Sequence, residues 1–209
     1  MTILYGTSNP AKLAMMQKFL AGAQIKLLSL SDMKTPPPEV AETGASPLEN
    51  ARMKADAYFK AYGIPVFSCD SGLYFDDVSE EIQPGVNVRN IRCKGKSLDD
   101  DEMIAYYSAL ARQYGENGAL TARYRNAICL VTAENTRFES MEDALSGNPF
   151  LLVAKPHATR CKGFPLDSLS AEIASGKYYN DLSVKVQSND TVMANAFRTF
   201  FVDALGDKS

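Results

Sequence analysis

Two short clusters of polar residues hold the side chains best suited to phosphate chemistry. In the first, Asn50 and Lys54 lie four residues apart, so they share one face of a predicted helix. Asp70 follows at the predicted end of a buried strand, with Ser71 and Gly72 after it. A lysine binds phosphate as a point charge, and a carboxylate binds the metal ion that accompanies the phosphate. This combination predicts a site for a phosphate chain and its metal.

The second cluster, Thr7-Ser8-Asn9-Pro10-Ala11-Lys12, follows the first predicted strand. Backbone N–H groups at the start of a helix bind anions, and Lys12 lies one turn further along. The stretch lacks the glycine pattern of a Walker loop. Helix capping alone would also account for Ser8 or Asn9. The phosphate-binding interpretation of this cluster therefore depends on the first cluster.

Two carboxylates complete the candidate chemistry. Glu42 precedes the helix that carries Lys54, and together with Asp70 it offers the oxygen ligands that Mg²⁺ prefers. A bound Mg²⁺ would offset charge on a leaving phosphate group. One of the carboxylates would deprotonate the attacking water. Lys12 and Lys54 would balance the remaining phosphate charge.

Helices and strands must position these residues. Strands are predicted over residues 2–6, 25–30, 64–68, 119–133, 137–141 and 150–154, with extended structure again over 72–75; helices are predicted from residue 9 or 10, over 47–62, from residue 97 and over 190–205. Ser46 and Glu49 predict a capping box at the second helix, and Gly63 its end. Ser97 is expected to cap the third helix, because the acidic run after it favours a helix N-terminus. Helices and strands without strict alternation favour an α/β chain with a long mixed sheet.

Length and composition bound the function classes. The chain has 209 residues, 45% of them hydrophobic, which fits one large domain or a two-lobed one. A net charge of −3 gives no overall basic field for nucleic acid. The first residues include no basic region and no long apolar run, so we expect no signal peptide. No apolar stretch approaches the ~20 residues that span a bilayer. The four cysteines form no Cys-x-x-Cys pair, which favours reduced, buried thiols. We therefore expect a cytoplasmic protein that binds neither nucleic acid nor membrane.

The order and spacing of the motifs resemble the inosine triphosphate pyrophosphatase family, the Ham1-like nucleotidases. The matching stretches are Thr7 to Lys12, Glu42 to Gly44, Glu49 to Ala55, Asp70 to Leu73 and Pro84 to Val86. The resemblance implies one domain over residues 1–209, an elongated mixed β-sheet flanked by helices, with two lobes and a central cleft. It implies Mg²⁺-dependent hydrolysis of a nucleoside triphosphate, such as ITP, dITP or XTP, to the monophosphate and pyrophosphate. Such enzymes are often dimeric, so a homodimer is an expectation.

The resemblance also assigns roles to residues. Asp70 corresponds to the catalytic base and a metal ligand, and Glu42 to a second metal ligand. Including the residues argued above, the predicted substrate contacts are Thr7, Ser8, Asn9, Lys12, Asn50, Lys54, Ser71, Gly72, Phe164, Asp167 and Lys177.

The match weakens in the C-terminal half. The stretch from Gly163 to Asp167 resembles a family segment that packs an aromatic ring on the base, but Leu166 replaces an aromatic residue there. The family's Ser-His-Arg motif is missing after Lys177, and Cys69 stands where many relatives have a second acid. These departures leave the base specificity open. Two alternatives therefore remain: a nucleotide-binding relative with impaired catalysis, and a Maf-like pyrophosphatase with different base specificity.

Overall fold

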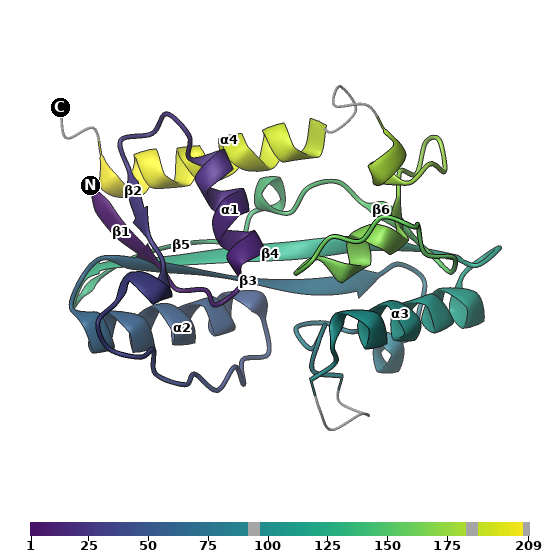
Figure 1. The fold of residues 1–209 in the computed structure, drawn as a ribbon, viewed down its shortest axis with the longest axis horizontal. Helices are drawn as coiled ribbons and strands as arrows, with labels where there is room; N and C mark the ends of the chain where they lie inside the picture. The colour runs from purple at the N-terminus through teal and green to yellow at the C-terminus, as the bar shows by residue number, and fades with distance from the viewer. Residues whose placement is uncertain (92–96, 183–187, 207–209) are drawn as a thin grey trace. The chain divides into compact units, whose positions relative to one another are not determined.

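The computed structural model describes residues 1–91, 97–182 and 188–206, and Figure 1 shows their fold. The helices are α1 (Pro10–Phe19), α2 (Pro47–Tyr62), α3 (Asp100–Tyr114) and α4 (Ser188–Leu205); the strands are β1 (Thr2–Tyr5), β2 (Lys26–Leu28), β3 (Val66–Phe75), β4 (Ala119–Ala133), β5 (Thr136–Ser140), β6 (Phe150–Val153) and β7 (Ser170–Ala171). The strand order is β2-β1-β3-β4-β6-β7, with β5 also paired to β4. Parallel pairs around β1 and antiparallel pairs around β4 and β6 make the sheet mixed, which confirms the predicted α/β class.

The chain divides into two compact units. The first joins three separate stretches, Met1–Ser71, Arg125–Ser146 and Asp190–Ser209, and the second joins Gly72–Tyr124 with Gly147–Asn189. Every predicted catalytic or metal-binding residue falls in the first unit. The single-domain boundary stays a prediction.

The first unit packs helices on both faces of its strands. Successive residues of a strand point to opposite faces, and β1 follows this rule. On one face Tyr5 stacks on Phe67 with ring centroids 4.4 Å apart, and Phe201 of α4 meets Phe67 edge-on at 5.0 Å. On the other face Leu4 packs with Ala51 and other buried residues of α2. The helix α2, which carries the first polar cluster, is therefore fixed to the sheet by its apolar side.

The core of the second unit forms around Tyr107 of α3. Its ring lies edge-on to Phe75 at 6.4 Å, and its hydroxyl donates to the carbonyl of Val88 at 2.8 Å. The strand β6 pairs antiparallel with the first part of β4, so that Leu152 lies opposite Leu120. Both leucines belong to the same buried cluster as Tyr107.

The strand that carries Asp70 is longer than predicted. We predicted a strand over residues 64–68 that stops near Asp70, with extended structure again from Gly72, but β3 runs without a break from Val66 to Phe75. Buried polar side chains need hydrogen-bonding partners, and the sequence pattern alone named no partner within the sheet. The structure supplies these partners from α2, so Asp70 stays inside the strand.

The helix caps agree in part with the sequence. The Ser46 hydroxyl accepts the N–H of Glu49 at 3.3 Å, and Gly63 ends α2 with φ 64°. The Glu49 carboxylate accepts the N–H of Ala45 rather than that of Ser46, so the predicted capping box is wrong in one bond. Asp99 rather than Ser97 caps α3, because its carboxylate is the one that accepts a first-turn N–H, from Glu102, at 2.8 Å.

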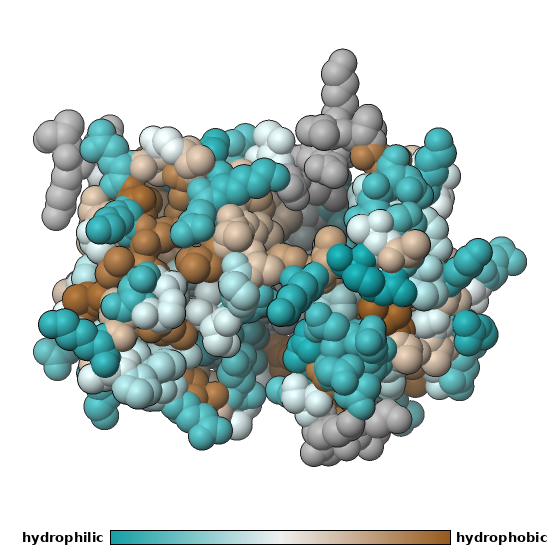
Figure 2. Space-filling view, in the orientation of Figure 1, coloured by the Kyte–Doolittle hydropathy of each residue, from teal (hydrophilic) through white to brown (hydrophobic). Residues whose placement is uncertain are grey.

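Apolar side chains reach the surface over α1, β2 and α4 among charged neighbours (Figure 2). On α4, Val192 is 50% exposed and Val202 61% exposed. Among the helices in the described ranges, none combines the length and the apolar character that crossing a membrane requires. Cys69, Cys129 and Cys161 are free thiols, and Cys93 lies outside the described residues.

Candidate active site

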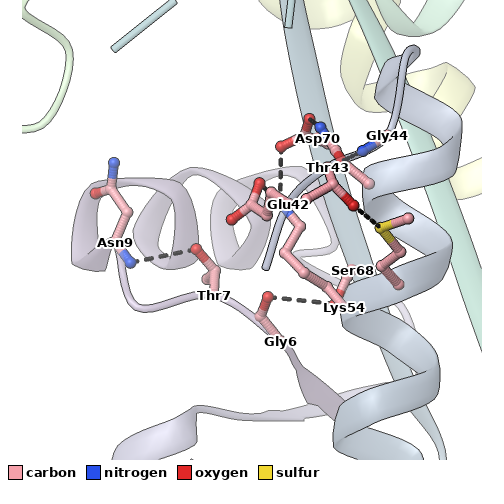
Figure 3. Close-up of polar contacts among 11 residues, drawn as sticks. Gly6, Thr7, Asn9, Glu42, Thr43, Gly44, Lys54, Ser68 and Asp70 are labelled. Atoms are coloured by element: carbon pink, nitrogen blue, oxygen red, sulfur yellow. Dashed lines mark hydrogen bonds and ion pairs between the residues drawn. The ribbon is translucent and has the colours of Figure 1, made fainter. Parts of the chain in front are cut away.

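Lys54 lies between two carboxylates at the centre of the candidate site. Its Nζ is 2.7 Å from Asp70 Oδ1 and 3.0 Å from Glu42 Oε2, and the three side chains converge in Figure 3. Lys54 and Asp70 are nearly buried, whereas the Glu42 side chain is 43% exposed. Burial by itself would lower the pKa of Lys54, but the carboxylates of Asp70 and Glu42 offset it and raise that pKa. The ammonium group is therefore charged and doubly paired.

Asn50 lies one turn before Lys54 on α2 and hydrogen-bonds to both segments that carry the carboxylates. Its Nδ2 donates to Asp70 Oδ2 at 3.2 Å, and its Oδ1 accepts the N–H of Gly44 at 2.8 Å. A Cβ on Gly44 would lie 2.7 Å from Asn50 Oδ1, so only glycine fits this turn. Asn50 is 2% exposed, and both ends of its amide are already bonded within the protein. It braces Asp70 and the turn after Glu42, while its contact with substrate stays a prediction.

The start of α1 offers a second cation. Asn9 caps this helix, because its Oδ1 accepts the N–H groups of Ala11 at 2.9 Å and Lys12 at 3.4 Å. Thr7 Oγ1 accepts the N–H of Asn9 at 3.2 Å, and Ser8 is exposed beside it. Burial, and then the charge of Lys54, lower the pKa of Lys12. Within the described residues the Lys12 ammonium makes no hydrogen bond or ion pair, so it can receive an anion.

Cys69 and Asp70 point to opposite faces of β3, as neighbours in a strand do. The Cys69 side chain packs with the cluster around Tyr5, whereas Asp70 bonds to α2. Burial raises the pKa of the Cys69 thiol to about 12, so it is neutral at physiological pH. An acid at position 69 would not share the face of Asp70. The cysteine therefore leaves the Glu42–Lys54–Asp70 group intact.

Comparison with known proteins identifies the family. The model of the Ham1 family matches residues 3–198. The chain belongs to the Ham1 family. A relative from Rhodopseudomonas palustris named dITP/XTP pyrophosphatase is 31% identical over 164 residues, which cover 78% of this chain and 73% of the relative.

Solved Ham1-family structures share the fold. The structure of a nucleoside-triphosphatase / dITP/XTP pyrophosphatase from Mycobacterium abscessus superposes with a TM-score of 0.68 at 25% identity, covering 95% of this chain and 98% of that one. The structure of a HAM1 protein from Coxiella burnetii gives a TM-score of 0.73 at 23% identity, covering 98% and 100%. These matches confirm the resemblance drawn from the sequence motifs.

The remaining predicted contacts of this Ham1-family chain lie on β3 and in the second unit. Ser71 is half-buried on β3, and a Cβ at Gly72 would lie 2.7 Å from the Tyr74 ring. In the second unit Phe164 is half-buried, while Asp167 and Lys177 are exposed. Their contacts with substrate stay predictions.

Two contacts in the second unit could not be predicted from the motifs. Leu166, which replaces an aromatic residue, is only 3% exposed and packs in the core. Asp100 supports the neighbouring turn: its Oδ2 accepts the N–H of Gly163 at 3.2 Å, and its Oδ1 accepts from Arg89 at 2.7 Å. Sequence reasoning missed Arg89 and Asp100 because their partners are distant in the chain and no short motif joins them.

The donors present limit how a metal could be held. Across the part of the chain that the structure describes, no group of three or more His, Cys, Asp or Glu residues could hold a metal ion. Glu42 and Asp70 are two carboxylates that face one cation. Mg²⁺ is usually bound through one or two carboxylates, with water and substrate phosphates as the other ligands. The donor set therefore fits a divalent cation that shares its ligands with a phosphate substrate.

Proposed function

We propose that this Ham1-family protein hydrolyses a nucleoside triphosphate to the monophosphate and pyrophosphate. The observation that carries the proposal is the group of Glu42, Lys54 and Asp70, with Lys12 close enough to feel the charge of each. Carboxylates for a metal and lysines for phosphates are what the hydrolysis of an anhydride requires. The names of the relatives support a deaminated purine nucleotide such as ITP, dITP or XTP as the substrate.

Mg²⁺ is the divalent cation that we assign to this reaction, with Glu42 and Asp70 as its protein ligands. When bound, it would neutralise negative charge on the phosphate oxygens and on the departing pyrophosphate. The start of α1 and Lys12 would hold the phosphate chain by backbone N–H groups and by charge. The two lysines and the metal thus divide the charge of the substrate between them.

Asp70 is the residue that we assign as general base. Its carboxylate accepts a proton from the attacking water, whose oxygen forms the new bond to phosphorus while the anhydride between the α and β phosphates breaks. Asn50 Nδ2 and Lys54 Nζ hold the two oxygens of Asp70 at 3.2 and 2.7 Å. The bond from Asn50 to Asp70 Oδ2 can hold the base in one orientation while Lys54 contacts the phosphates, so little reorganisation is needed when the water arrives.

Pyrophosphate release from the purified protein with Mg²⁺ tests this function. The panel contains the triphosphates of inosine, xanthosine and deoxyuridine and the ordinary nucleotides. We expect release from at least one of them, and Asp70→Asn should lower kcat by about 10²- to 10⁴-fold. Asp203→Asn, an exposed acid on α4, is the matched control. The absence of release across the whole panel would contradict the function, and thermal stabilisation by a nucleotide without turnover would indicate a binding protein instead.

Base discrimination should be weaker than a site with buried polar donors achieves. The chain lacks the Ser-His-Arg motif, and a site that cannot hydrogen-bond the base edge separates similar bases poorly. We expect the ratio of kcat/KM for ITP to that for ATP to measure this directly. We also propose a homodimer, to be tested by light scattering, and a cytoplasmic location, where nucleotide pools are found.

A further inference from the structure

The proposed metal ligands are already occupied by a cation of the protein itself. Lys54 Nζ contacts one oxygen of Asp70 at 2.7 Å and one of Glu42 at 3.0 Å. The second oxygen of Asp70 accepts from Asn50 at 3.2 Å. A divalent ion that binds both carboxylates would therefore compete with the Lys54 ammonium for the same oxygens.

The charges of the group are balanced without a metal. Glu42 and Asp70 contribute two carboxylates, and Lys54 and Lys12, when both are protonated, contribute two cations. The charges of Lys54, Asp70 and Glu42 all influence the pKa of Lys12, so its side chain lies within electrostatic range of this group. Charges that are partly buried are screened less than charges in water. A divalent ion arriving alone would meet two ammonium groups and no net negative charge.

A triphosphate changes this balance because it brings several negative charges of its own. Lys12 has no partner within the described residues, and phosphate oxygens would offer both lysines a new one. Once Lys54 bonds to phosphate, the oxygens of Glu42 and Asp70 become available. The lysine stem is fixed on α2, so the ammonium can change partners by rotation of the side chain while the helix stays in place.

We propose that Lys54 is an internal counter-cation that holds Glu42 and Asp70 until nucleotide arrives, and so makes divalent-metal binding depend on the triphosphate. This inference rests on the proposed function for the identity of the metal ligands. It adds an order to binding: the metal enters with the triphosphate or after it. It also gives Lys54 two tasks, because the same ammonium first pairs with the carboxylates and then with the phosphates.

Binding of Mn²⁺ tests the inference without any turnover. Protein-bound Mn²⁺ is measured by electron paramagnetic resonance, with and without inorganic triphosphate and against the same Mn²⁺–triphosphate mixtures without protein, on the wild type and on Lys54→Gln. We expect Mn²⁺ alone to bind Lys54→Gln at least about tenfold more tightly than the wild type, because a competing charge is gone. Triphosphate should strengthen Mn²⁺ binding to the wild type much more than binding to the variant.

Three further variants locate the effect. Lys60→Gln removes an exposed lysine from the same helix and should behave as the wild type. Lys54→Arg keeps the charge and should keep Mn²⁺ binding weak. Asp70→Asn added to Lys54→Gln should abolish the gained affinity, which would place the ion at these carboxylates.

Equal Mn²⁺ affinity in the wild type and Lys54→Gln would overturn the inference. If Lys54→Gln fails to fold, the wild type still decides, because tight Mn²⁺ binding in the absence of triphosphate contradicts a competing lysine. The two proposals can fail separately. Mn²⁺ binding that depends on triphosphate, in a protein that releases no pyrophosphate from any nucleotide, would support this inference and contradict the hydrolysis.

Discussion

At the scale of single residues, Asn50 has a stability role that can be separated from its place near the chemistry. Its amide is buried and satisfies both the N–H of Gly44 and one oxygen of Asp70. Asn50→Leu has nearly the same shape but leaves both partners unsatisfied, which should cost about 1–3 kcal/mol of folding free energy. We expect kcat to fall as well, because Asp70 loses a fixed oxygen. Urea unfolding and steady-state kinetics measure the two effects, and unchanged stability would contradict the brace.

Lys12 should make nucleotide binding sensitive to alkaline pH. Its pKa is lowered below the ordinary lysine value of 10.5 by burial and by the charge of Lys54, so Lys12 loses its proton at a lower pH than other lysines. As the pH rises through that lowered pKa, the phosphates lose one cation and the KM for nucleotide should increase.

The test compares KM from neutral pH to about pH 10 in the wild type and Lys12→Arg. Arginine stays charged throughout this range, so the alkaline increase in KM should disappear in the variant. Lys60→Arg, an exposed change on α2, should retain the wild-type profile. An alkaline increase that survives in Lys12→Arg would assign the effect to another group.

At the scale of elements, an ion pair fixes α2 to β5 and so holds the helix that carries Lys54. Arg52 donates to both oxygens of Glu139, at 2.8 and 2.6 Å. The Arg52 guanidinium lowers the pKa of Glu139 from its ordinary value of 4.5. A carboxyl group whose pKa is lower in the folded state stabilises the fold at pH values above its unfolded-state pKa. This stabilisation is lost as the pH falls through the folded-state pKa.

Glu139→Gln should therefore destabilise the protein at neutral pH, by up to about 1 kcal/mol. The difference from the wild type should shrink at pH values below 4.5, where Glu139 itself becomes protonated. Chemical denaturation at several pH values measures this, with the exposed Glu142→Gln as the matched control. A difference that is constant with pH would mean that packing, rather than the ion pair, is responsible.

The sequence predicts local features of these elements better than their tertiary surroundings. The strand over residues 119–133 and the stop of α2 at Gly63 are confirmed, because β-branched and apolar runs and a C-cap glycine act locally. For the helix over residues 190–205 the apolar spacing predicts that Val192, Ala196, Phe200 and Leu205 face inward. This is partly wrong, because Val192 is 50% exposed, whereas Phe197 and Phe201 are buried. Helical spacing gives the period of an apolar face, but the sheet beneath decides which side is covered.

The candidate site likewise combines local features that the sequence predicts with tertiary contacts that it does not. Spacing correctly placed Lys54 on a helix, and the structure adds that this side chain meets Glu42 and Asp70 at one point. No pattern could show that Lys54 is paired in advance or that Asn50 is fully bonded, because both facts depend on side-chain packing between α2 and β3. The motifs thus identify the residues of the site. Which side chains pair before substrate binds is evident only from the tertiary structure.

At the scale of the whole molecule, the first unit is completed by the last helix of the chain. Arg198 of α4 donates to the carbonyl of Phe19 at 2.6 Å, at the end of α1. Phe201 packs on Phe67 of β3, three residues before Asp70. A helix that contributes none of the candidate site residues therefore supports the strand that carries the proposed base. This dependence makes the stability of the site a property of both ends of the chain.

Adjacent residues of α4 allow a matched test of that dependence. Phe201 is 1% exposed, and its removal leaves a cavity beside Phe67, so Phe201→Ala should cost about 3–5 kcal/mol. Val202 is 61% exposed, so Val202→Ala should change stability by less than about 0.5 kcal/mol. Urea unfolding gives both values, and hydrogen exchange should show faster opening of β1 and β3 in Phe201→Ala. Equal stability of the two variants would mean that α4 is dispensable to this core, and protected β3 amides in Phe201→Ala would separate the strand of Asp70 from the helix.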